Sequence, residues 1–133
     1  MADTTDLERA VLEKLLDGEH PVLQALRAQL EVSEVSARTF TGVGFFTTFK
    51  VPPQAPAAPV KAASLAFGDV VATIPGVQHG AGFVLFIKDG RLDTLEGYTY
   101  DEDWPESIPA FELDYVGSTG TRDLSALDPH QHD

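Results

Sequence analysis

The spacing of hydrophobic residues changes once along this chain, near Ser36, from a helical period of about 3.6 to a strand period of 2. Helices therefore come first and strands follow, which is typical of α+β domains. We predict an N-terminal helix pair packed on a mainly antiparallel, curved sheet of five or six strands. The 133 residues are about what one domain requires.

Two segments have the spacing of amphipathic helices. The first covers residues 6–16, with Thr4, Thr5 or Asp6 as its N-cap. The second begins at Pro21, because proline suits the first helical position. The two apolar stripes contain Leu7, Val11, Leu12, Leu15, Leu16, Val22, Leu23, Leu26 and Leu30. Neither helix is long enough to be stable alone, so both must pack on the strands.

Six segments have the composition and spacing of β-strands. They are residues 36–40, 42–51, 67–74, 83–88, 91–100 and 111–116. Asp89-Gly90 predicts a tight hairpin, because both residues tolerate the positive φ of a primed turn. The last of these strands alternates apolar and acidic residues, and at a sheet edge it could pair with its copy in a homodimer.

Residues 52–64 contain four prolines and five alanines, a composition that prevents strand pairing. We interpret them as an extended loop within one domain that covers residues 1–116. Residues 117–133 have no strong hydrophobic pattern and predict a flexible acidic tail.

The net charge of -12 makes nucleic acid and anionic membranes unlikely partners and favours a basic protein. The chain has no cysteine, which excludes disulfides and thiolate zinc sites. No second histidine stands at a metal-ligand spacing from His79, so we expect no metal site and no cofactor. The chain also has no apolar run of roughly 20 residues and an acidic start, so we expect a cytoplasmic protein.

One candidate site is a small-molecule pocket inside the curved sheet. His79 lies in a glycine-rich loop, where a histidine can be a ligand or a proton carrier. The predicted lining is His79, Glu96, Tyr98, Phe83, Phe45 and Trp104. Two structural alternatives stay open: His79 could serve the turn or the core, and a bulge at Gly97 could turn Glu96 to solvent.

The turn at Asp89-Gly90 limits what stands opposite Glu96. A two-residue turn places Phe83 there, and a three-residue turn places Val84 there. Glu96 is next to an apolar residue in either register. Burial at that position would raise its pKa and suit it to acid or base chemistry.

A second candidate site is an acidic and aromatic surface. Residues 92–120 contain eight carboxylates and no Lys or Arg. The candidate surface consists of Asp101, Glu102, Asp103, Trp104 and Glu106, with Tyr98 and Tyr100 nearby. Aromatic side chains within a charged rim are typical of protein-binding sites. Alternatively, Trp104-Pro105 closes the end of the sheet as a plug.

Three segments resemble a family of uncharacterised small bacterial proteins. They are GVGFFTTF at residues 42–49, IPGVQHGAGFVLFIKDG at residues 74–90 and LEGYTYDEDWPE at residues 95–106. Relatives resemble Gly-Glu-x-Trp-Pro in the last segment, whereas this chain has Asp101 in place of the glycine. The resemblance implies a shared fold and a bacterial cytoplasmic origin, and it implies no activity.

No serine lies in a Gly-x-Ser-x-Gly motif, and no other nucleophile is indicated. We therefore predict a non-catalytic binding or accessory protein, of an immunity-like kind, that uses the acidic and aromatic surface. The alternative is a small-molecule binding protein or enzyme that uses Glu96 and His79 in the curved sheet.

Overall fold

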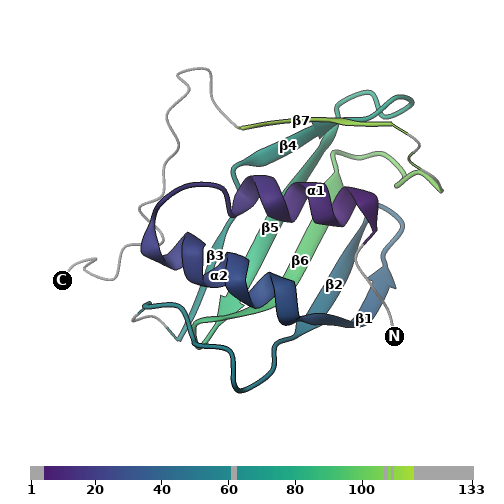
Figure 1. Cartoon of the computed structure of the whole chain (residues 1–133). Coiled ribbons are helices and arrows are strands. Elements are labelled where there is room, and N and C mark those ends of the chain that lie inside the picture. The colour runs from purple at the N-terminus through teal and green to yellow at the C-terminus, as the bar shows by residue number, and fades with distance from the viewer. Residues whose placement is uncertain (1–4, 61–62, 107, 109, 116–133) are drawn as a thin grey trace.

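Two helices lie on one face of a seven-stranded antiparallel sheet in the computed structural model (Figure 1). The structure describes residues 5–60, 63–106, 108 and 110–115, so the predicted tail at 117–133 lies outside it. The helices are α1 (Asp6–Leu15) and α2 (Pro21–Val32). The strands are β1 (Glu34–Phe40), β2 (Gly44–Lys50), β3 (Ser64–Phe67), β4 (Val70–Thr73), β5 (Ala81–Lys88), β6 (Arg91–Thr99) and β7 (Glu112–Tyr115). The predicted α+β fold with an N-terminal helix pair is confirmed.

Both helices begin where the sequence predicts. The Thr5 side chain accepts a hydrogen bond from the Glu8 N–H, and the Glu8 carboxylate accepts one from the Thr5 N–H, which makes a reciprocal capping box. Pro21 occupies the first turn of α2, and the Nδ1 atom of His20 accepts from the Val22 N–H at 3.2 Å. His20 therefore serves as a helix cap.

The strands follow the order β1-β2-β6-β5-β4-β7, so β1 and β7 form the edges, and β3 pairs with β5 beyond the end of β4. The single strand predicted at residues 67–74 is corrected: Gly68 and Asp69 separate β3 from β4. The five residues from Phe67 to Val71 stand against the four residues of β5 from Gly82 to Leu85, which is a bulge. A Cβ at Gly68 would lie 2.0 Å from the Phe83 carbonyl oxygen, so a side chain does not fit there.

The β5–β6 hairpin has a two-residue turn, the shorter of the two lengths considered from the sequence. Asp89 and Gly90 have φ values of 52° and 76°, and Lys88 pairs with Arg91. A register shift beyond Ile87 then leaves Asp93 without a partner on β5. This shift brings Glu96 opposite Val84, the neighbour expected for a longer turn.

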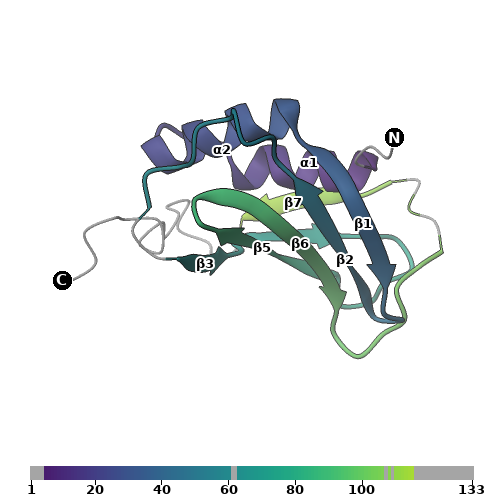
Figure 2. The same ribbon diagram turned by 90° about the horizontal axis from the view of Figure 1, so that it is seen from below.

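The core lies between the helices and one face of the sheet (Figure 2). Alternate residues of β5 point into it: Phe83, Leu85 and Ile87 are at most 1% exposed. The helices contribute Val11, Leu12, Leu15, Leu16, Val22, Leu23 and Leu26, all fully buried. The other face of the sheet carries no helix in the described part of the chain, and Phe46 is 39% exposed there.

Candidate functional site

The six residues of the predicted pocket lie on both faces of the sheet. Phe45 and Phe83 are buried on the side of the helices. The Trp104 ring packs edge-on against Phe45, with ring centroids 5.1 Å apart. Trp104 therefore closes one end of the core, as the plug interpretation requires.

Glu96 and Tyr98 lie on the open face. Glu96 is only partly buried and pairs with Phe46 on β2 and Val84 on β5. The Tyr98 ring covers Gly82, where a Cβ would lie 2.6 Å from the phenolic oxygen. Burial of Tyr98, with smaller contributions from Tyr100 and Glu96, raises the pKa of its phenol.

Gly97 does not form the bulge considered for Glu96. It pairs in regular register with Phe45 and Phe83, and the Phe45 ring occupies the space that a side chain at this position would need. Glu96 reaches the open face through ordinary strand alternation.

His79 lies in the loop between β4 and β5. It lines a surface pocket of about 390 Å³ together with Gln78 and Tyr100. Its N–H donates to the Glu102 carboxylate at 2.9 Å, and the Gln78 N–H donates to the same carboxylate at 2.8 Å. The structure therefore separates His79 and Glu96 from the aromatic residues of the core.

The four acidic residues of the predicted surface do not all have the same role. Asp101, Asp103 and Glu106 are exposed. Glu102 instead fixes the loop of His79, and the two backbone hydrogen bonds that it accepts lower its pKa. Asp101 adopts a left-handed conformation with φ of 65°, which aspartate tolerates better than most residues.

Several hydrophobic side chains near these acids are exposed: Phe40 lines a hollow together with Glu106, and Tyr100 directly precedes Asp101. Phe40 is 66% exposed, Val43 is 47% exposed and Tyr100 is 45% exposed. The β1–β2 turn meets the segment after β6 through a hydrogen bond from the Trp104 N–H to the Gly42 carbonyl at 2.7 Å. The acidic–aromatic end, as we name it, comprises Phe40, Val43, Tyr100, Asp101, Asp103, Trp104 and Glu106.

A pocket of about 310 Å³ opens at this end, between the first turn of α1, the end of β1 and the segment after β6. Its apolar lining is Leu7, Phe40, Phe45, Trp104, Pro105 and Ile108. Its polar lining is Thr5, Asp6, Glu8, Arg38 and Glu106. A second hollow of about 300 Å³ shares Phe40, Trp104, Pro105 and Glu106 with it.

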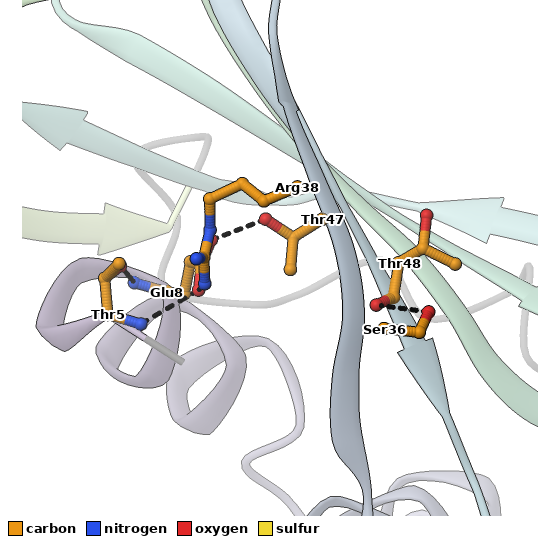
Figure 3. A network of polar contacts seen from close by, with 6 residues as sticks. All are labelled: Thr5, Glu8, Ser36, Arg38, Thr47 and Thr48. Carbon is orange, nitrogen blue, oxygen red and sulfur yellow. Dashed lines mark hydrogen bonds and ion pairs between the residues drawn. The ribbon is translucent and has the colours of Figure 1, made fainter. Parts of the chain in front are cut away.

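The Glu8 carboxylate is one of the groups that line the pocket. Figure 3 shows it between Thr5, Arg38 and Thr47. Glu8 is 2% exposed and accepts from Arg38 Nε at 2.8 Å, Arg38 Nη2 at 2.6 Å and Thr47 Oγ1 at 2.5 Å. Burial by itself raises the pKa of Glu8, but the hydrogen bonds from Arg38, Thr47 and Thr5 outweigh burial and lower it. The hydrogen bond to Glu8 likewise raises the pKa of Arg38.

Glu8 and Arg38 were not predicted as site residues from the sequence. The spacing Thr5-x-x-Glu8 is a recognisable capping box, and it could have indicated a Glu8 side chain turned back toward the helix start. No local signal identifies Arg38, because its contact with Glu8 spans 30 positions of the chain.

Within the described residues, no group of three or more histidine, aspartate or glutamate side chains is arranged to hold a metal ion. Neither helix in that part of the chain is long and apolar enough to cross a membrane. No family model matches the chain, and no curated protein and no solved structure is significantly similar to it.

Proposed function

We propose that this protein is a binding protein that recognises a basic protein partner through its acidic–aromatic end. The observation that carries the proposal is the exposure of Phe40, Val43 and Tyr100 among carboxylates. Exposed apolar side chains that gather in one place are typical of interaction sites. Aromatic residues at the centre of an interface contribute much of the binding energy.

Charge supports a basic partner over an acidic one. Asp101, Asp103 and Glu106 are exposed at this end, and the whole chain carries a formal charge of -12. Such a field accelerates the approach of a positively charged protein and repels an acidic one.

Hydrogen bonds from Thr99 and Glu102 order the backbone of the acidic–aromatic end. The Thr99 N–H donates to the Val43 carbonyl at 2.8 Å, and the Thr99 hydroxyl bonds to the Val43 and Glu102 carbonyls. Glu102 anchors the neighbouring loop through the N–H groups of Gln78 and His79. A surface that is ordered before binding loses less conformational entropy when the partner arrives.

The alternative function, a small-molecule site or enzyme built on Glu96 and His79, has less support. Glu96 lies on the open face of the sheet, whereas His79 lies in the loop that Glu102 anchors. A homodimer through β7 stays a prediction; β7 pairs with β4 on one side and is an edge strand.

An arginine-rich peptide tests the proposal. We expect binding that weakens strongly between about 0.05 M and about 0.5 M salt, because the interaction is between exposed charges. The triple variant Asp101→Asn, Asp103→Asn, Glu106→Gln should bind more weakly than the wild type. Asparagine suits the left-handed conformation at position 101, so this variant should fold normally.

A control variant loses the same number of negative charges at another place. It shows whether the affinity depends on the carboxylates of the acidic–aromatic end or on the net charge of the protein. Glu34→Gln, Glu112→Gln, Asp114→Asn removes three exposed charges from the edge strands β1 and β7. We expect this control to keep most of the affinity. Equal loss in both triple variants, or binding that does not depend on salt, would contradict the proposal.

A further inference from the structure

We propose that the pocket beside Trp104 receives one long basic side chain of the partner, an arginine or a lysine. This inference rests on the proposed function and names the chemical group that the acidic–aromatic end recognises. The pocket measures about 310 Å³, at the lower end of the range for ligand pockets, which suits one side chain better than a large cofactor.

The charges inside the pocket do not cancel. Among the described residues, Asp6, Glu8 and Glu106 line it together with one cation, Arg38. Two guanidinium hydrogen bonds from Arg38 go to the buried Glu8, so these two charges largely offset each other. Among the described residues, neither Asp6 nor Glu106 forms an ion pair, and two carboxylates are left to attract an incoming cation.

The first turn of α1 has an opposing effect on a cation. A helix N-terminus carries a partial positive charge of about half a unit. Asp6 lies in this first turn and offsets that partial charge. The balance of the pocket stays negative because Glu106 comes from a different part of the chain.

The apolar lining suits the hydrocarbon part of a basic side chain. Phe40, Trp104 and Pro105 line the pocket together with Glu106. The methylene groups of lysine and arginine bury well on such surfaces while the charged end stays near solvent and carboxylates. An arginine over an indole ring also gains a cation–π interaction.

Trp104 provides a direct readout because it is the only tryptophan in the chain. The probes are acetyl-argininamide, acetyl-lysinamide and the neutral acetyl-citrullinamide, each added to the full-length protein. We expect the two cations to shift the Trp104 indole N–H resonance and fluorescence in a saturable way, and citrulline to have little effect. Equal responses to the arginine and citrulline probes would overturn the inference.

Single substitutions localise the effect. Asp6→Asn and Glu106→Gln should each weaken the arginine response about two- to fivefold, as expected for partly exposed ion pairs. Phe40→Ala tests the apolar contact and should leave the fold intact, since Phe40 is 66% exposed. Glu112→Gln on β7 is the matched control and should change nothing. The inference is wrong if all three pocket variants respond as the wild type does.

Binding of the arginine-rich peptide distinguishes a failure of the pocket inference from a failure of the proposed function. If the peptide binds in a salt-dependent manner but the three pocket variants bind it normally, the acidic–aromatic end acts as a charged surface and only the pocket inference fails. If the peptide does not bind at all, the proposed function fails as well.

Discussion

Arg38 on the edge strand β1 holds Glu8 on the first turn of α1 by two side-chain hydrogen bonds, at 2.8 and 2.6 Å. The same carboxylate caps its own helix through the Thr5 N–H and accepts a hydrogen bond from Thr47 of β2. One buried glutamate therefore joins the helix layer to the sheet, and it also lines the pocket beside Trp104.

Removing Arg38 should destabilise the protein far more than removing a surface ion pair. Arg38→Leu leaves the 2% exposed Glu8 without its counterion, and we expect a loss of about 3 kcal/mol in the free energy of unfolding. Urea denaturation measures this loss. The matched control is Glu13→Gln, which breaks an exposed pair with Arg9 and should cost less than about 0.5 kcal/mol. Similar costs for the two variants would contradict a structural role for the buried pair.

The depressed pKa of Glu8 predicts that stability falls in acid. The folded state holds this carboxylate ionised to a lower pH than the unfolded state, whose glutamate pKa is about 4.3. The contribution of Glu8 is therefore fully present above about pH 4.3 and is lost as the pH falls through the folded pKa. Glu8→Gln should flatten the curve of unfolding free energy against pH below about pH 5. An unchanged slope in Glu8→Gln would mean that other carboxylates cause the acid sensitivity.

Gln29 connects α2 to the Pro/Ala-rich loop and to the β5–β6 turn. It is fully buried, donates to the Gly90 and Pro56 carbonyls at 2.8 and 3.0 Å, and accepts from the Leu92 N–H at 3.0 Å. Gln29→Leu removes all three hydrogen bonds, although the Gly90 carbonyl keeps the Ala58 N–H at 2.7 Å, and we expect a loss of about 2 kcal/mol in the free energy of unfolding. Gln24→Leu, which removes one exposed hydrogen bond to Glu19, is the control in the same denaturation experiment and should have a small effect. Comparable losses of unfolding free energy in the two variants would show that the burial of Gln29 does not determine the effect of its removal.

Local patterns predicted the helices, their starts and the Asp89-Gly90 turn, because these depend on residues close in sequence. The division of β3 from β4 and the shift at Asp93 were not predicted, since each depends on how two strands meet. The predicted pocket combined residues of both faces of the sheet for the same reason. The register shift at Asp93 places Glu96 opposite Val84 and not opposite the buried Phe83. The pairing of Glu8 with Arg38 depends on the docking of α1 on the sheet, and no local pattern encodes it.

Gly97 is required by the ring that covers it. A Cβ at this position would lie 2.3 Å from Phe45 Cε1, and Phe45 in turn supports Trp104. Gly97→Ala should cost about 1–3 kcal/mol through overpacking and should shift the fluorescence of Trp104. In a Phe45→Leu background the added methyl group has more room, so the further cost of alanine should be smaller. Additive costs in the double variant would show that the two positions do not compete for the same space.

Ionisation of the Glu102 carboxylate should change the chemical shifts of two backbone amide protons. It accepts from the N–H groups of Gln78 and His79, and these hydrogen bonds hold its pKa below the ordinary glutamate value of about 4.3. Protonation weakens both hydrogen bonds, so the two amide proton resonances should move together, with a midpoint below about pH 4.3. Glu102→Gln should abolish this shared transition, whereas Asp103→Asn on the same exposed segment should preserve it. A midpoint at or above the ordinary value, or a transition that survives Glu102→Gln, would mean that Glu102 does not anchor the loop of His79.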